Sequence, residues 1–233
     1  MKIPKIVHQT WKSKTVPVRW QGAVASVRQH HPGWEYRLWT DAEMDAHVEA
    51  HQPELWPVYR DFDKNIMRAD VFRYVAMHDI GGLYADLDYE FLRPFPYGST
   101  QLLLSEEFSL SFGDSLDQIA NYVFASRPGH PFWKDVITDL IDNPPGVGDY
   151  TDVIDATGPG FLSRVFFTNR DRYEGVTVTP KPALSPTRLH SSLERKILLN
   201  SGVTYGLHHG SGSWKERWTP TYVRTKIAKA LRL

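Results

Sequence analysis

Hydrophobic and polar positions follow two different periods along the first half of the chain, and each period predicts a type of element. Short apolar or alternating segments predict strands at residues 3–10, 34–39 and 83–91. Apolar residues at helical spacing predict helices at residues 18–31, 53–60 and 64–79. Thr40 and Glu43 have the spacing of a capping box, which predicts that a further helix begins there. Gly81 and Gly82 predict the end of the helix that precedes the third strand.

The second half of the chain has shorter elements of the same two types. Its predicted strands are residues 102–104, 119–125, 176–179 and 203–207. Its predicted helices are residues 131–141 and 161–167, and residues 210–213 predict a mobile loop. Strands that alternate with helices favour an α/β fold with a mainly parallel sheet, in which ligands bind beyond the carboxyl ends of the strands.

The composition excludes several classes of protein. A length of 233 residues fits one large domain or one domain with a small lobe. The 27 Lys and Arg residues are balanced by 27 Asp and Glu residues, which argues against a protein that binds nucleic acid over a basic face. Because the chain has no Cys, thiolate catalysis, a Cys-rich zinc site and a disulfide framework are excluded. No run of about 18 apolar residues occurs, so we expect a soluble, cytoplasmic protein.

Two aspartates near the end of the predicted strand 83–91 carry the clearest chemical signal. If residues 83–88 are extended, Tyr84, Asp86 and Asp88 share one face of the strand. Two carboxylates at close range repel one another unless a cation lies between or near them. Mg²⁺ and Mn²⁺ prefer oxygen ligands, often bind through one or two carboxylates and complete their shells with phosphate oxygens. The pair therefore indicates a divalent metal ion and a phosphate-bearing ligand.

Other uses of an Asp-x-Asp pair fit the neighbouring residues less well. A calcium-binding EF-hand loop would need Asp or Asn at position 90 and Gly at position 91, where this chain has Glu90 and Phe91. Glu90 also weakens the interpretation as a phosphatase that forms an aspartyl phosphate. The remaining alternative is that Asp86 and Asp88 are solvated residues at the end of a strand.

The preceding helix adds a second pair of charges. Asp70 and Arg73 are three residues apart, so they lie on one face of the predicted helix 64–79 and can form an ion pair. The alternative is a surface ion pair worth under about 1 kcal/mol. Because the surrounding positions are apolar, we expect the helix to pack on the sheet with this pair directed at the edge that carries the aspartates. An Arg fork there suits oxyanions such as a sugar phosphate.

Four segments taken together resemble the DXD-containing glycosyltransferases. They are residues 3–11, 68–74, 81–88 and 208–214. The most similar groups are the fungal α-mannosyltransferases with this motif and the bacterial capsule and lipid-glycan transferases, and a more distant likeness is to the glucosylating domains of large clostridial toxins. The resemblance implies the GT-A fold, a nucleotide-binding α/β sandwich, as a single catalytic domain over residues 1–218. It also implies transfer of a sugar from a UDP- or GDP-sugar with retention of configuration.

The resemblance implies roles for individual residues. The residues expected in catalysis are Asp70, Arg73, Asp86, Asp88 and Asn121. The residues expected around the donor are His8, Gln9, Thr10, Trp11, Gly82, Tyr84, Ser213 and Trp214. Asp88 would bind Mn²⁺ or Mg²⁺ directly, Asp86 would contact ribose or sugar hydroxyls and the metal indirectly, and His208 would supply the third metal contact. We expect His208 rather than His209 to be the ligand, because adjacent residues of a strand point in opposite directions. Residues 157–160 resemble the turn that lies near the acceptor in this family.

We therefore expect a metal-dependent retaining glycosyltransferase that moves a hexose or GlcNAc to a glycan or a lipid-linked acceptor, without binding nucleic acid. No carboxylate stands out as a covalent nucleophile, so a front-face mechanism is favoured. The alternatives are a protein-modifying transferase, a nucleotide-sugar hydrolase and a non-catalytic module that binds nucleotide sugars or glycans. Residues 219–233 form a basic tail without acidic residues, and we expect it to rest on an anionic membrane surface, the alternative being a solvated terminal helix.

Overall fold

The computed structural model describes residues 2–107, 118–146, 152–184 and 192–210 of the 233-residue chain. Its centre is a seven-stranded sheet in the order β2-β1-β3-β7-β5-β6, with β8 paired to β5 on a separate branch. The strands are β1 (Ile6–Thr10), β2 (Glu35–Trp39), β3 (Gly82–Ala85), β5 (Leu102–Glu107), β6 (Gln118–Ile119), β7 (Val123–Ser126) and β8 (Val176–Thr179).

Most strands of this sheet run in one direction. β1 is parallel to β2 and β3, and β5 is parallel to β8. β7 is antiparallel to both β3 and β5, so these two strands point the same way, and only β6 and β7 run against the other five. The expected α/β fold with a mainly parallel sheet is confirmed.

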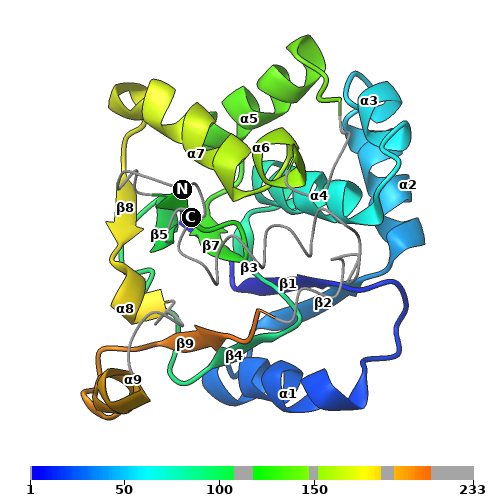
Figure 1. The fold of residues 1–233 in the computed structure, drawn as a ribbon. Helices are drawn as coiled ribbons and strands as arrows, with labels where there is room; N and C mark the ends of the chain where they lie inside the picture. Colours follow the sequence, from blue (N-terminus) through cyan, green and yellow to red (C-terminus); the bar gives the residue numbers. More distant parts are fainter. Residues whose placement is uncertain (1, 108–117, 147–151, 185–191, 211–233) are drawn as a thin grey trace, which may run out of the picture.

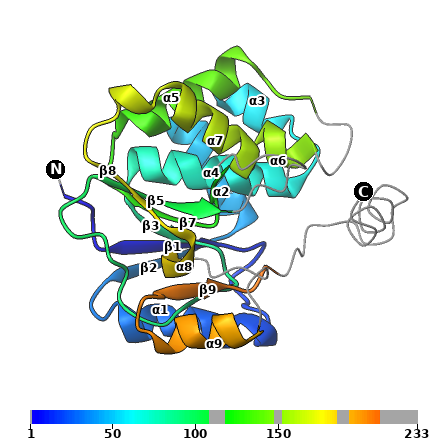
Figure 2. The same cartoon turned by 60° about the vertical axis from the view of Figure 1, so that its left-hand side comes forward.

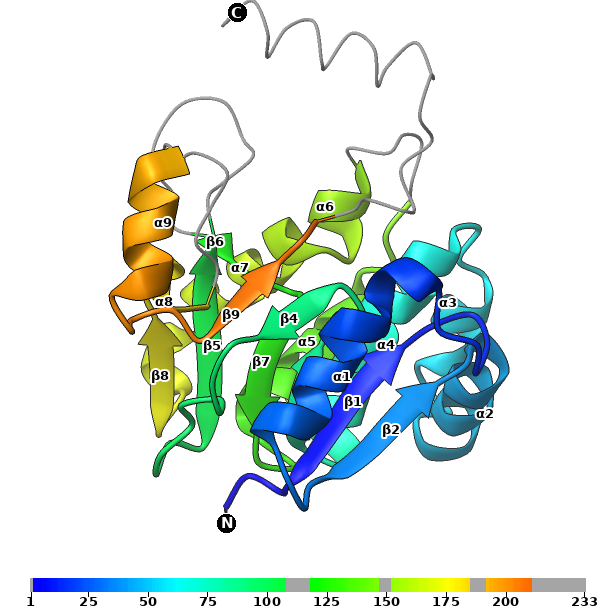
Figure 3. The same ribbon diagram turned by 90° about the horizontal axis from the view of Figure 1, so that it is seen from below.

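Helices cover both faces of the sheet (Figures 1 and 2). One face carries α2 (Asp41–His51), α3 (Trp56–Arg60), α4 (Asn65–Asp79), α5 (Pro131–Asp142), α6 (Asp152–Ala156) and α7 (Pro159–Thr168). The opposite face carries α1 (Gln21–His30) and a separate pair of strands, β4 (Tyr89–Phe91) and β9 (Gly206–His208). The short α8 (Lys181–Leu184) and α9 (Ser192–Asn200) lie at the edge near β8 and β9, as Figure 3 shows.

The strands divide their side chains between two hydrophobic cores, as the alternation along a strand requires. Leu102 and Leu104 belong to the core under α4 and α5, whereas Leu103 belongs to the core under α1. In the same way Tyr84 enters the first core, and its neighbour Leu83 enters the second. The sheet is therefore buried on both faces, so its open edge at the carboxyl ends of the strands is the place for a ligand site.

Local sequence signals explain where several helices begin. The Thr40 side chain accepts a hydrogen bond from the Glu43 amide, and the Glu43 carboxylate accepts one from the Thr40 amide, so the predicted capping box is present at the start of α2. α4 begins one residue after the predicted position and ends at Asp79. Gly81 and Gly82 follow with positive φ angles, as the predicted helix stop requires.

The predicted strand 83–91 is wrong in its middle. β3 ends at Ala85, and the Tyr89 amide then donates to the Asp86 carbonyl at 2.9 Å, which closes a turn over residues 86–89. Ala85 opposite Val123 is the last residue pair between β3 and β7, so the chain leaves the large sheet and pairs β4 with β9 instead. Asp86 and Asp88 therefore lie in a turn between two sheets and not on one face of a continuous strand.

The predicted strand 119–125 is also interrupted, because residues 120–122 separate β6 from β7. Of the predicted loop 210–213, only Gly210 lies within the described residues. Among the residues that the structure describes, no helix has both the length and the apolar character needed to cross a bilayer.

Candidate functional site

A cavity of about 460 Å³ opens at the carboxyl ends of β1 and β3, where the fold predicts a ligand site. Its walls come from segments far apart in the sequence: the end of β1, the starts of α2 and α4, the turn after β3, the link between β6 and β7, and α6 with α7. The residues expected from the sequence that line it are Thr10, Trp11, Asp70, Arg73, Asp86, Asp88, Asn121 and His208.

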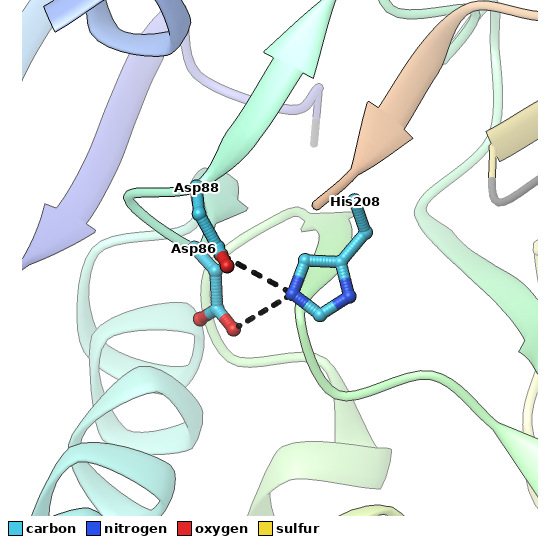
Figure 4. A group of neighbouring side chains, drawn as sticks. All are labelled: Asp86, Asp88 and His208. Atoms are coloured by element: carbon cyan, nitrogen blue, oxygen red, sulfur yellow. Dashed lines mark ion pairs between the residues drawn. The ribbon is translucent and has the colours of Figure 1, made fainter. Parts of the chain in front are cut away.

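Asp86, Asp88 and His208 meet at one side of this cavity (Figure 4). The His208 Nε2 atom lies 3.2 Å from a carboxylate oxygen of Asp88 and 3.6 Å from one of Asp86. One donor atom from each residue lies within 4.8 Å of the other two. His209 points away, as expected, and its ring contacts Glu90 at 2.9 Å.

The three side chains fit a divalent cation. Neighbouring ligands of an octahedral ion with bonds of about 2.1 Å are roughly 3.0 Å apart, close to the two distances at His208. Carboxylate and imidazole are both accepted by Mn²⁺, and carboxylates by Mg²⁺. Burial raises the pKa of Asp86, against the lowering effect of Arg73. Burial alone would lower the pKa of His208, but the hydrogen bond and charge of Asp88 raise it, so the cluster favours a positive charge.

A buried ion pair lies directly beside this cluster. Arg73 contacts Asp70 at 3.0 Å and Asp86 at 3.0 Å, and all but about 3% of the Arg73 side chain is buried. A surface ion pair between Asp70 and Arg73 is thereby excluded. Burial raises the pKa of Asp70 to about 7 even though Arg73 lowers it, which shows how strongly the apolar surroundings oppose a charge here.

The Arg73 guanidinium also contacts backbone oxygens. Besides the two carboxylates, the guanidinium donates to the Asn121 carbonyl at 2.6 Å and to the Ala69 carbonyl at 3.2 Å. The guanidinium also lies over the Tyr84 ring, 4.7 Å from its centroid. Arg73 is thus fixed from several sides, and it lies between the two carboxylates.

Asp70 is further held by two neutral side chains. The Asn121 amide donates to one carboxylate oxygen at 3.0 Å, and the Thr157 hydroxyl donates to the other at 3.2 Å. Thr157 belongs to the turn that the sequence places near an acceptor, and the following Gly158 and Pro159 line the cavity. This turn therefore connects the wall of α6 and α7 to the buried carboxylate.

The structure places four of the expected donor residues beneath the cavity and not in its wall. His8 accepts from the Trp39 indole at 3.0 Å and contacts the Gly81 carbonyl at 2.9 Å, and burial lowers its pKa to about 4. Gln9 donates to the Asp86 carbonyl, and the Tyr84 hydroxyl donates to the Asp86 carboxylate.

The fourth of these residues, Gly82, packs so tightly against β1 that an added Cβ would lie 2.6 Å from the Ile6 carbonyl oxygen. Gln9 and Tyr84 thus hold the turn that carries the aspartates, whereas His8 and Gly82 fix the start of β3. Ser213 and Trp214, also expected around the donor, lie outside the described residues.

Several cavity residues were not singled out from the sequence. They are Lys12, Trp20, Asp41, Asn65, Glu107 and Tyr122. Lys12 follows a predicted strand end and Asn65 begins a predicted helix, so their position at this edge could have been inferred. Glu107 and Tyr122 gave no such signal, because their segments reach the cavity only through the antiparallel part of the sheet. Tyr122 stacks on His208 with ring centroids 3.9 Å apart.

Comparisons with known proteins find glycosyltransferases. Residues 17–109 match the family described as the glycosyltransferase sugar-binding region containing a DXD motif. The chain is 34% identical over 169 residues to inositol phosphoceramide mannosyltransferase 1 of Schizosaccharomyces pombe, covering 71% of this chain and 51% of the relative. It is 24% identical over 201 residues to the initiation-specific alpha-1,6-mannosyltransferase of Candida albicans, covering 70% of this chain and 52% of the relative. The chain thus spans about half the length of these relatives.

A solved structure supports the fold. The PaToxG glycosyltransferase superposes with a TM-score of 0.54 over 72% of this chain and 70% of its own, at 13% sequence identity. The GT-A-like arrangement expected from the sequence is therefore shared with a structure of very different sequence.

Proposed function

From the match of residues 17–109 to the glycosyltransferase sugar-binding region containing a DXD motif, we propose that the protein is a metal-dependent, retaining glycosyltransferase. Its donor is a UDP- or GDP-sugar and its acceptor a glycan or glycolipid. The observation that carries the proposal is that the Asp86, Asp88 and His208 cluster opens into the same cavity as the buried pair of Asp70 and Arg73. The Asp86, Asp88 and His208 cluster suits a diphosphate with its cation, and the pair of Asp70 and Arg73 suits sugar hydroxyls.

The relatives narrow the proposed substrates. The names of both relatives describe mannosyltransferases, and one acts on inositol phosphoceramide. We therefore propose mannose as the first sugar to test, and an inositol-containing glycolipid as the first acceptor.

In the proposed reaction the bond between the anomeric carbon and the diphosphate oxygen breaks, and the acceptor oxygen bonds to that carbon from the same face. The acceptor proton passes to the departing phosphate oxygen. Asp86, Asp88 and His208 would hold the cation, which when bound stabilises the charge that develops on the leaving diphosphate. Asp70, fixed by Arg73, Asn121 and Thr157, would orient the sugar hydroxyls.

The surroundings of Asp70 favour this route over a covalent intermediate. Both carboxylate oxygens are engaged by Arg73, Asn121 or Thr157, so the group is oriented and its nucleophilicity is reduced. Detection of a glycosyl adduct on the protein by mass spectrometry would contradict the front-face mechanism.

The proposal is tested by thermal unfolding with UDP, GDP and their mannose, glucose, galactose and GlcNAc derivatives, each with and without Mn²⁺. A ligand that binds only the folded protein adds about 2.7 kcal/mol of stability at 100 times its Kd. We expect this stabilisation with at least one donor, only when Mn²⁺ is present, and lost in Asp88→Asn. Glu90→Gln is the matched control, because Glu90 lies two residues away and pairs with His209 outside the cluster.

If no donor stabilises the protein in a way that depends on Mn²⁺, the proposal is wrong. Release of free sugar without transfer to any glycan or glycolipid would favour the nucleotide-sugar hydrolase, and binding without turnover would favour the non-catalytic module. Transfer to a protein acceptor would favour the protein-modifying enzyme.

We also propose that the protein acts at the cytoplasmic face of a membrane. The support is the charge of residues 219–233, which lie outside the described residues, and the lipid named for one relative. Deletion of residues 219–233 should reduce co-sedimentation with anionic liposomes. If co-sedimentation stays unchanged, the tail does not bind the membrane and no longer supports the proposal.

A further inference from the structure

Tyr122 contacts both His208 and Asp86 of the candidate metal cluster, although the reaction proposed above gives it no role. It lies in the link between β6 and β7, so it belongs to the large sheet. His208 belongs to the separate pair β4 and β9, and Asp86 and Asp88 lie in the turn between the two sheets. On one side the ligands are joined by β4 and β9, with Tyr89 opposite His208, and by the His209 amide, which donates to the Asp88 carbonyl at 3.1 Å. These pairings do not connect His208 to the large sheet, to which Tyr122 belongs.

Two contacts of Tyr122 join these parts. Its ring stacks on the His208 imidazole with centroids 3.9 Å apart and planes 18° apart. Its backbone carbonyl accepts a hydrogen bond from the Asp86 amide at 2.8 Å. Tyr122 is 3% exposed, and its ring also faces Tyr89, the first residue of β4, at 6.3 Å.

From this geometry we propose that Tyr122 is the positioning residue of the metal site: it holds the His208 ring at the distance from Asp86 and Asp88 that a cation requires. A turn of the imidazole out of its plane would lose this face-to-face contact at 3.9 Å, so the stack keeps the ring in the plane in which Nε2 lies 3.2 Å from Asp88. Residues that orient metal ligands in this way typically contribute a factor of about 10 to 100 in metal affinity. The inference rests on the metal dependence proposed above.

The test measures Mn²⁺ binding alone by isothermal titration calorimetry, without nucleotide or acceptor. We expect Tyr122→Leu to weaken Mn²⁺ binding about 10-fold or more, and Tyr122→Phe, which keeps the stacked ring, to stay within about 3-fold of wild type. Phe132→Leu removes a buried aromatic ring from α5, far from the cluster, and should leave Mn²⁺ affinity unchanged. It controls for a general loss of packing.

A double-mutant cycle shows whether Tyr122 acts through His208. In the His208→Ala background, Tyr122→Leu should have little further effect on Mn²⁺ affinity, because the ligand that it positions is gone. Equal affinity of Tyr122→Leu and wild type, additive losses in the cycle, or a loss in Tyr122→Phe as large as in Tyr122→Leu would each overturn the inference. No Mn²⁺ binding by the wild type would overturn the proposed metal dependence and this inference together.

A second measurement needs no variant of Tyr122 and serves if Tyr122→Leu does not fold. The ring current of a stacked Tyr moves the carbon-bound ring protons of His208 upfield in the NMR spectrum of the wild type, with the resonance assigned by its loss in His208→Ala. An unshifted resonance would show that the stack is absent and would overturn the inference.

Discussion

Arg73 is the residue on which the charges of the site depend most directly. It lies between the carboxylates of Asp70 and Asp86, both at 3.0 Å, and it is almost fully buried. Two carboxylates brought out of water without this cation would each be strongly disfavoured. Its role in holding the site together is therefore separable from any contact with the donor, and stability measurements reveal it without substrate.

Arg73→Met should lower the free energy of unfolding by about 3–5 kcal/mol, because it leaves the buried carboxylate of Asp70 and the partly buried one of Asp86 without their partner. The control is Arg164→Met, which removes the exposed pair with Asp139 and should cost under about 1 kcal/mol. Urea unfolding of both variants at pH 7.5 measures the difference. Similar losses in the two variants would contradict the structural role assigned to Arg73.

The two adjacent histidines at the end of β9 offer a second comparison between single residues. His208 faces Asp86 and Asp88, whereas His209 faces Glu90. His208→Ala should weaken Mn²⁺ binding at least about 10-fold, and His209→Ala should leave it unchanged, as calorimetry would show. If His209→Ala weakened Mn²⁺ binding more than His208→Ala, the two His side chains would have exchanged sides at the end of β9 in the metal-bound protein.

The elements around β3 show how local strain and close packing create the site. Gly82 has a φ angle of +109°, and its backbone lies against Ile6 of β1, so no side chain fits there. β3 then runs for only four residues before the turn that carries the aspartates. The position of the turn thus depends on the close approach of β3 to β1, and the glycine is needed for that approach.

Gly82→Ala should destabilise the protein by about 1–2 kcal/mol for the positive φ angle and by a further 1–3 kcal/mol for the displaced backbone. Gly98→Ala is the matched control, since Gly98 also has a positive φ angle but nothing lies within 4 Å of its added Cβ. Thermal or urea unfolding separates the two contributions. Equal losses would show that the contact with Ile6 relaxes without cost.

At the scale of the whole molecule, a buried His makes stability depend on pH. His8 lies between the Trp39 indole and the Gly81 carbonyl, and burial lowers its pKa from 6.5 to about 4. Above pH 6.5 the ring is neutral in both the folded and the unfolded chain, so His8 adds no pH dependence. Below pH 6.5 the unfolded chain takes up a proton that the folded protein excludes, and stability falls until the pH reaches about 4.

We expect this group to remove about 2 kcal/mol of stability between pH 7.5 and pH 5. His8→Gln cannot take up the proton, and its amide can still donate to the Gly81 carbonyl. The stability that this variant loses between pH 7.5 and pH 5 should therefore be about 2 kcal/mol smaller than the stability that wild type loses. The exposed His51, changed to Gln, is the control and should follow wild type. Parallel urea-derived stability curves for wild type and His8→Gln would contradict the assignment.

Most element types, the start of α2, the pairing of Asp70 with Arg73 and the position of Asp86 and Asp88 at the ligand edge of the sheet could be predicted from the sequence. Each depends on residues within a few positions of one another, where periodicity, capping and helical spacing act. The preference for His208 over His209 followed in the same way from the alternation along a strand, given a family resemblance that brought this segment to the site.

Only the tertiary structure decided how these pieces meet. The break after Ala85 depends on where β7 stops pairing, and the placement of His8, Gln9, Gly82 and Tyr84 beneath the cavity depends on the packing of β3 on β1. Arg73 donates a hydrogen bond to the carbonyl of Asn121, 48 residues away in the chain, and Tyr122 stacks on His208. No local pattern in the sequence relates the segments that these contacts join. Local patterns in the sequence determined the main elements and the pairs Asp70 with Arg73 and Asp86 with Asp88, because those patterns act between near neighbours. Long-range packing decided which of these residues line the cavity and which support it from below, because burial and contact across a sheet exist only after the chain has folded.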